Sequence, residues 1–149
     1  MRLSVLAIVV AGFATVACGG TTTSPTSPSA QTMSGSWVGR TSDSSGSMMG
    51  AGLTSAQWAV MQSGTSFSGT MQFPGYMMGG TMTVTGTVNG RTGTFTMTMP
   101  VGSMMMAGCT ATASGTFDMD DMMTQMQGTY SGTNSCTGAF DHGQMSMHR

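Results

Sequence analysis

The sequence contains no lysine and no glutamate: its four cationic residues are all arginine, and its five acidic residues are all aspartate. Charged residues make up only 6% of the chain, too few for the basic patch that nucleic-acid binding needs. General acid–base catalysis is also poorly served, because glutamate is absent and only two histidines, His142 and His148, are present. No serine or cysteine nucleophile has a nearby base that would activate it. We therefore expect neither a nucleic-acid partner nor an enzyme.

Large aliphatic residues are almost as scarce as charge. Beyond Cys18 the chain has a single leucine, Leu53, and no isoleucine, whereas every methionine except Met1 lies there. Low charge together with abundant serine, threonine and glycine is also typical of disordered chains. The regular alternation described below favours a folded domain instead, and helix signals are missing from it.

The one long apolar run lies near the start of the sequence, where residues 3–17 follow Arg2. About fifteen residues of helix span about 22 Å, which is shorter than the roughly 30 Å core of a bilayer. This length favours a signal peptide over a membrane-spanning helix. The run ends in the tetrapeptide TVAC at residues 15–18, which resembles the lipobox of bacterial lipoproteins, although Thr15 stands where leucine is usual.

The resemblance implies that residues 1–17 are removed and that Cys18 becomes the N-terminus, carrying diacylglycerol and a further acyl chain such as palmitate. Several acyl chains would anchor the protein stably in a membrane, which is then its first partner. An ordinary secretory peptide that leaves Cys18 as a free thiol is the alternative. Gly19 stands where inner-membrane retention usually has aspartate, so the resemblance implies the outer membrane. Residues 18–34 are rich in Ser, Thr and Pro and predict a flexible tether.

The remaining residues, 35–149, repeat a short pattern: a glycine, then threonine or serine, then a large apolar residue. Around each copy, apolar residues alternate with threonine or serine, and this period of two indicates half-buried β-strands. Residues 81–85 and 94–99 are the clearest examples. The copies begin at Gly35, Gly69, Gly80, Gly86, Gly93, Gly115 and Gly128.

Turn residues predict how these strands pair. Asn89-Gly90 is typical of a two-residue type I′ hairpin turn, because both residues tolerate positive φ. A turn centred on these two residues places Val84 opposite Phe95, so that two apolar side chains meet on one face. The hairpin is among the strongest short-range signals in the sequence.

A second hairpin is predicted at residues 63–66, where a glycine lies between polar residues. Its register places Trp58 opposite Met71 and Val60 opposite Gly69. The large side chains of both strands then lie on the same face, as a sheet with one buried face requires.

A third hairpin, turning within residues 119–126, brings the two cysteines beyond Cys18 together. Its register pairs Phe117 with Gly128, and the same register places Cys109 opposite Cys136. Two thiols at matched positions in an oxidising compartment predict a disulfide. A zinc site is the alternative, but it would need more ligands than two cysteines supply.

A strand at residues 35–41 and another at residues 142–148 complete a set of eight. Connections are short throughout, which predicts antiparallel neighbours in sequence order. We therefore expect an all-β domain over residues 35–149, an up-and-down meander that closes into a small barrel without exposed edges. An open β-sandwich is the alternative. The pattern is similar to small lipocalin- and avidin-type barrels and to bacterial lipoproteins built from such strands.

An eight-stranded barrel has room for packed side chains or for one small molecule. Glycines at inward positions either hollow this interior or let the strands coil tightly around a full core. We expect a non-catalytic binding or structural lipoprotein of the cell envelope that holds a small apolar ligand in the barrel. The candidate ligand-binding residues are Trp58, Met71, Met82, Phe95 and Met97.

Methionine is the compositional anomaly, with 20 copies in 149 residues. Many lie at inward positions and replace leucine and isoleucine in the core. The doublets and triplet at residues 48–49, 77–78, 104–106 and 122–123 fall in predicted loops and need another account. Compositional drift, oxidant scavenging through sulfoxide and Cu(I) binding by soft thioethers are the three interpretations. No cofactor is expected otherwise. The candidate soft-metal ligands are Met119, Met122, Met123, Met126, His142, Met145, Met147 and His148.

Overall fold

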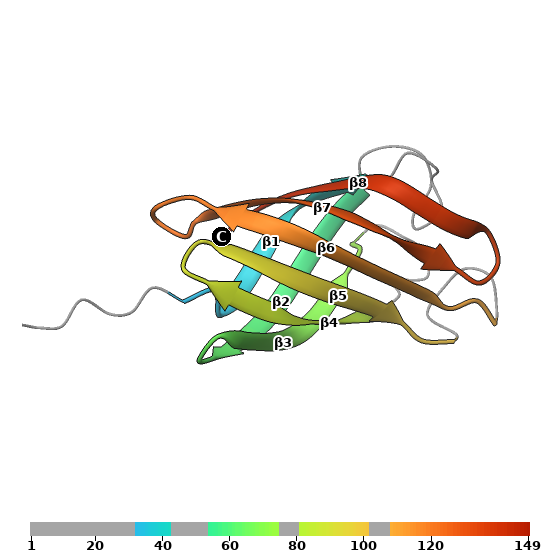
Figure 1. The fold of residues 1–149 in the computed structure, drawn as a ribbon, viewed down its shortest axis with the longest axis horizontal. Helices are drawn as coiled ribbons and strands as arrows, with labels where there is room; N and C mark the ends of the chain where they lie inside the picture. The colour runs from blue at the N-terminus through green and yellow to red at the C-terminus, as the bar shows by residue number, and fades with distance from the viewer. Residues whose placement is uncertain (1–31, 43–53, 75–80, 102–107) are drawn as a thin grey trace, which may run out of the picture.

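Eight antiparallel strands close into a single barrel in the computed structural model (Figure 1), which describes residues 32–42, 54–74, 81–101 and 108–149. Each strand pairs with the next along the chain, and β1 pairs with β8. The predicted closed up-and-down barrel is confirmed, and the open sandwich is wrong. The strands are β1 (Gly35–Ser42), β2 (Thr54–Ser63), β3 (Ser66–Gln72), β4 (Thr81–Asn89), β5 (Thr92–Met99), β6 (Ala111–Met119), β7 (Gln125–Asn134) and β8 (Gly138–His148).

The two ends of the barrel differ. One end, which we name the hairpin end, carries the short turns β2–β3, β4–β5 and β6–β7, the start of β1 and the end of β8; it lies on the left in Figure 1. The opposite, loop end carries the β1–β2, β3–β4, β5–β6 and β7–β8 connections. The methionines predicted in loops at residues 48–49, 77–78 and 104–106 lie outside the described residues.

The registers of two predicted hairpins are confirmed. Trp58 pairs with Met71 between β2 and β3, and Phe117 pairs with Gly128 between β6 and β7. The latter register carries through to the disulfide between Cys109 and Cys136, whose Cα atoms lie 5.7 Å apart. The bridge ties the residues before β6 to those after β7 at the loop end.

The predicted register of the β4–β5 hairpin is wrong by two residues. Asn89 remains in the ladder and pairs with Thr92, so the two-residue loop is Gly90-Arg91 rather than Asn89-Gly90. Only Gly90 of these residues has positive φ, at 62°, which matches a turn with glycine at its first central position. Phe95 therefore lies opposite Gly86 instead of Val84. A shift of two preserves the face of every side chain, so the same residues point inward.

Aromatic rings from neighbouring strands lie over the inward glycines. A Cβ added to Gly86 would lie 2.5 Å from the Phe67 ring, and one added to Gly93 would lie 2.3 Å from the Phe117 ring. The glycines thus leave room for rings from neighbouring strands, as in a sheet that coils around a filled core. Of the two interpretations of these glycines, the structure supports tight coiling at these positions.

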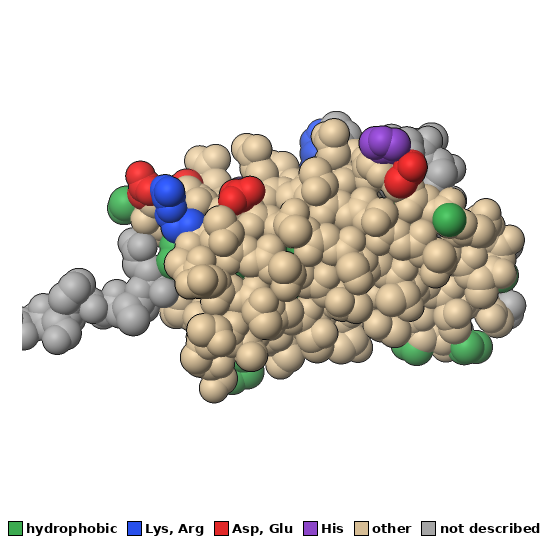
Figure 2. Space-filling model, viewed as in Figure 1, with side chains coloured by type: hydrophobic (Ala, Val, Ile, Leu, Met, Phe, Trp, Pro, Cys, Tyr) green, Lys and Arg blue, Asp and Glu red, His purple; other side chains and the backbone are tan. Residues whose placement is uncertain are grey.

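The outer surface of β3 to β7 is a coat of hydroxyl groups. Cross-strand pairing arranges the outward side chains in three rows of Thr and Ser, such as the row Ser66, Thr87, Thr94, Thr116 and Thr129. Figure 2 shows that charged side chains are few on this face of the molecule. This polar, uncharged coat replaces the lysines and glutamates that the sequence lacks. The other two rows are Ser68, Thr85, Thr96, Ser114 and Ser131, and Thr70, Thr83, Thr98, Thr112 and Thr133.

Arg149 fastens the hairpin end. Its guanidinium donates hydrogen bonds to the carbonyl oxygens of Met123, at 2.6 Å, and of Thr32, at 2.8 Å. The same group lies over the Trp37 ring, 4.7 Å from its centroid, in a cation–π contact. Met33 is fully buried. The contacts of the barrel therefore extend upstream of β1 into the last residues of the predicted tether.

A β-bulge bends β8 near its start. Tyr130 pairs with Gly143, but two residues further along β7 Gly132 pairs with Phe140, so β8 contains one extra residue here. His142 occupies the bulge with φ of 55° and is exposed. The bulge thus directs this imidazole to the outside of the barrel. No helix of the described residues is long and apolar enough to cross a membrane.

Candidate functional site

The five predicted ligand-binding residues all belong to one buried cluster inside the barrel. They come from β2, β3, β4 and β5, and none is more than 2% exposed. The Trp58 and Phe95 rings meet edge to face with centroids 5.4 Å apart. Because β2 and β5 are not paired, this contact crosses the barrel interior. Trp58, Met71, Met82, Phe95 and Met97 thus belong to one packed cluster inside the barrel, on the inward faces that the alternation predicted.

The two tryptophans differ in one respect. Trp37 and Trp58 are paired across β1 and β2, and each is at most 1% exposed. Nε1 of Trp37 donates to the carbonyl oxygen of Met33 at 2.8 Å. Nε1 of Trp58 is equally inaccessible, but it has no hydrogen-bond partner among the described residues. It is the one buried side-chain nitrogen or oxygen in that part of the chain without a partner.

An unpaired buried N–H is unfavourable by about 1–3 kcal/mol, because the group loses its hydrogen bond to water and gains none in return. A trapped water could satisfy it only with about two to four polar partners. Trp58 pairs with Trp37 and Met71 and its ring meets that of Phe95, and these three side chains offer few polar partners for a water. The interior of the barrel therefore holds a hydrogen-bond donor that has no acceptor within the described ranges.

The interior carries no charged side chain among the described residues, where the only buried polar residues are Thr41 and Asn134. The Tyr130 hydroxyl, near the loop end, donates to the carbonyl oxygen of Ser42 at 3.0 Å. Thioethers make up much of the remaining wall, and methionine has three rotatable bonds that let it adapt to a guest. Burial of an ion in this environment would be strongly unfavourable.

The eight candidate soft-metal ligands are divided by the barrel wall. Pairing brings Met119 beside Met126 and Met126 beside Met147 on the inner face. The Arg149 guanidinium lies at the same end, and a second cation there would be repelled. Five candidates are buried: Met119, Met123, Met126, Met145 and Met147. Three are exposed: Met122, His142 and His148. Among the described residues, no three His, Cys, Asp or Glu side chains could together hold a metal.

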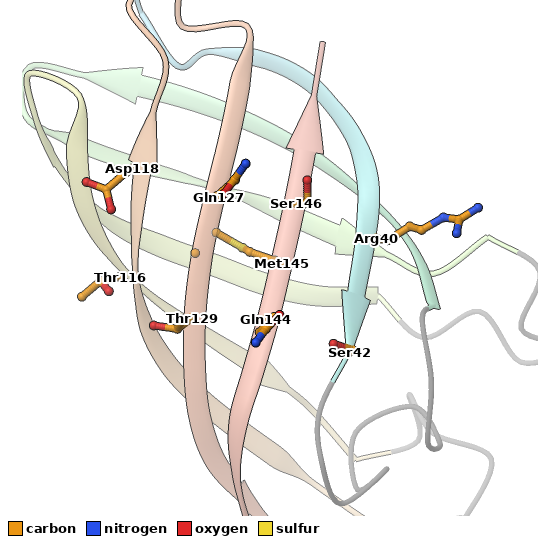
Figure 3. Close-up of a pocket in the computed structure, with 10 residues that line it drawn as sticks. Arg40, Ser42, Thr116, Asp118, Gln127, Thr129, Gln144, Met145 and Ser146 are labelled. Atoms are coloured by element: carbon orange, nitrogen blue, oxygen red, sulfur yellow. The ribbon is translucent and has the colours of Figure 1, made fainter.

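A shallow groove of about 560 Å³ lies on the outside of the barrel, across β6, β7, β8 and β1 (Figure 3). Arg40 and Asp118 lie at opposite sides of it, and Gln127 and Gln144 lie between them on β7 and β8. Met145 lies deeper, between the strands. These side chains can donate and accept hydrogen bonds, but they include no nucleophile with a general base.

The β6–β7 turn is occupied by its own hydrogen bonds. Asp120 accepts from the backbone N–H of Gln125 at 2.9 Å and from the backbone N–H and hydroxyl of Thr124 at 2.6 and 2.8 Å. The N–H of Gln125 is the largest influence that holds the pKa of Asp120 below its usual value. Asp121 pairs with Arg91 on the neighbouring turn. These carboxylates therefore serve the turns of the barrel.

Sequence reasoning missed two features of the interior. The alternation placed Trp58 inward but could not show that its N–H lacks a partner, because that depends on positions of every neighbour. It also missed the contact of Arg149 with Trp37, although an arginine after an alternating strand is a weak signal. The contact of Arg149 with Trp37 arises from pairing of β1 with β8, which are distant in sequence.

No protein-family model, no curated protein and no solved structure matches this chain.

Proposed function

We propose that this protein is a non-catalytic binding module of the cell envelope that holds a small, largely apolar ligand inside its barrel. The observation that carries the proposal is the unpaired Trp58 N–H inside a closed, Met-rich interior. A core evolved only for packing has no use for a donor without an acceptor, since it weakens the folded state. A bound molecule would satisfy it.

The methionines of this interior support the proposal. Met71 pairs with Met82, and Met97 pairs with Val84 on the next strand. Unbranched thioethers rearrange at low free energy, so the space around Trp58 can change its shape as a ligand enters. A wall of leucine and isoleucine would have fewer accessible rotamers and would resist such a change.

Tryptophan fluorescence tests the proposal, because the chain contains only two tryptophans. In a Trp37→Phe variant the remaining emission comes from Trp58. Heptane and methyl pentyl ketone, used as first probes, should change this emission saturably. The matched Trp58→Phe variant, which reports only from Trp37, should respond much less. Absence of a saturable change with any uncharged probe would contradict the proposal.

We further propose that Cys18 is lipidated and holds the barrel at the outer membrane. Residues 1–31, which include the lipobox-like TVAC, lie outside the described residues, so the support for this part is the sequence alone. Thr32 and Met33 join the barrel at the hairpin end.

A Cys18→Ser variant tests the anchor. It should remain as an uncleaved precursor and should not be labelled by palmitate in growing cells, whereas the parent chain is labelled. A Cys109→Ser variant, which keeps Cys18, is the matched control and should still be labelled. Normal labelling of Cys18→Ser would refute lipidation at this residue.

A further inference from the structure

We infer that the ligand of the barrel is an uncharged molecule whose apolar body carries a hydrogen-bond acceptor, such as a ketone or ester oxygen, which receives the N–H of Trp58. This inference rests on the proposed function and names the chemical class that the same site selects. It follows from two properties of the described interior: the Trp58 N–H has no acceptor there, and no charged side chain is buried there.

The donor determines that the ligand offers an acceptor. Indole Nε1 can only donate, and that of Trp58 is buried with no acceptor among the described residues. A pure hydrocarbon would fill space beside the ring but would leave the N–H unpaired. A carbonyl oxygen at the same place would form the hydrogen bond that Trp58 lacks within the described residues. Selectivity for the oxygen-bearing guest should therefore reside in this single residue.

The lack of charge determines that the acceptor is neutral. The buried polar side chains of the described interior are Thr41 and Asn134, and no Arg or His is buried there. Arg149 lies at the hairpin end over Trp37 and is engaged by backbone carbonyls. A carboxylate beside Trp58 would thus be a buried charge with no counter-ion, which is strongly unfavourable. Fatty acids in their ionised form are excluded, and their neutral derivatives are favoured.

The test uses three probes of one carbon number with the purified protein at neutral pH: heptane, methyl pentyl ketone and heptanoate. The quantity compared is the ratio of the ketone and heptane dissociation constants, because a ratio within one protein removes much of the general hydrophobic contribution. Trp58→Phe should shift this ratio against the ketone by about tenfold, the equivalent of one hydrogen bond. The indole N–H of Trp37 already has a partner in the protein, so Trp37→Phe should leave the ratio unchanged. Heptanoate should bind more weakly than the ketone in the wild type.

A nuclear magnetic resonance readout does not depend on whether Trp58→Phe folds. The wild-type protein gives two indole N–H signals, and the one missing from Trp37→Phe identifies the other as Trp58. The Trp58 signal should move downfield with ketone and much less with heptane. The contrary result is that heptane and ketone both bind and move the Trp58 signal equally, with a ratio of dissociation constants that is the same in Trp58→Phe as in the wild type. This result would overturn the inference while the proposed function stands. Tighter binding of heptanoate also overturns it. Failure of all three probes to bind overturns both.

Discussion

Trp37 and Trp58 are neighbours on paired strands, and both indoles are buried, yet within the part of the chain that the structure describes only the Trp37 N–H has an acceptor. At the scale of the residue, this difference has a consequence for stability that is independent of any ligand. Removing a donor that has an acceptor leaves the acceptor unpaired and lowers stability. Removing a buried donor that has no acceptor eliminates the unfavourable free energy of burying it unpaired.

Trp37→Phe should therefore destabilise the ligand-free protein by about 1–2 kcal/mol more than Trp58→Phe, although the two changes delete the same atoms. Trp37→Phe leaves the Met33 carbonyl oxygen without its donor, whereas Trp58→Phe removes a group that had no partner. Urea unfolding of both variants measures the difference. An equal or larger loss for Trp58→Phe would mean that its N–H is satisfied in solution.

At the scale of the element, the hairpins show how far the sequence could predict this fold. Period-two alternation identified the strands and their inward faces, because burial of one face is the dominant energy of a sheet. The position of the β4–β5 loop was missed, since Asn89 and Gly90 both suit a turn. The two loop positions give registers that differ by two residues and keep every side chain on the same face, so alternation alone could not choose between them.

The inward position of the candidate site residues could be predicted in part. Alternation placed Trp58 and Phe95 on inward faces, and the structure brings their rings together across the barrel. The soft-metal set was chosen by residue type and closeness in sequence. Residue type and closeness in sequence do not show on which side of the barrel wall a side chain lies. The β-bulge at His142 and the outward position of His148 separate the two imidazoles from the buried thioethers.

The β6–β7 turn should give a pH-dependent contribution to stability through Asp120. Hydrogen bonds lower the pKa of Asp120 in the folded state from its ordinary 3.8, the N–H of Gln125 being the largest influence. The stabilisation is therefore present above that ordinary value and is lost as the pH falls through the lower, folded-state value. Asp120→Asn should be less stable than the parent at neutral pH, and the gap should narrow below pH 3.8.

Denaturation midpoints of the parent and of Asp120→Asn, measured from neutral pH down to strongly acidic solution, give this comparison. Asp118→Asn, near the end of the preceding strand β6, is the matched control, because the Asp118 carboxylate accepts no hydrogen bond within the described residues. A gap between the parent and Asp120→Asn that stays constant with pH would show that the charge of Asp120 has no part in holding the turn.

The disulfide acts on the β6–β7 hairpin from its other end. Cys109 and Cys136 are 27 residues apart, so the bridge closes a loop that contains both strands. In the chain-entropy model, a closure of this length stabilises the fold by about 3–4 kcal/mol. Reduction of the purified protein, or the Cys109→Ser variant, should lower the free energy of unfolding by that amount. Unchanged stability after verified reduction would contradict the closed-loop account.

At the scale of the whole molecule, the barrel is joined at its hairpin end by contacts between residues far apart in sequence. Arg149 reaches the residues before β1, the β6–β7 turn and the Trp37 ring, each contact adding to the closure of β1 against β8. Sequence reasoning predicted that the barrel closes, but not that one side chain secures the seam.

Arg149→Ala should destabilise the protein by about 1–2 kcal/mol, since several hydrogen bonds of a charged group are lost at a partly exposed site. Arg149→Lys keeps the charge but not the planar fork that reaches separate carbonyls, and it should recover only part of the loss. Hydrogen exchange of the β1–β8 amides would measure the effect locally. Equal protection in Arg149→Ala and the parent would show that the seam closes without this residue.

The rows of hydroxyl groups over β3 to β7 bear on how the protein stays dispersed in solution. Proteins usually avoid association through mutual repulsion of like charges, which added salt screens within about 10 Å. A surface of Thr and Ser carries little charge for salt to screen. Its hydroxyl groups instead keep other molecules away through the water that they bind. Colloidal behaviour of this protein should therefore vary little with ionic strength, and it should respond instead to solutes such as sulfate that withdraw water from polar surfaces.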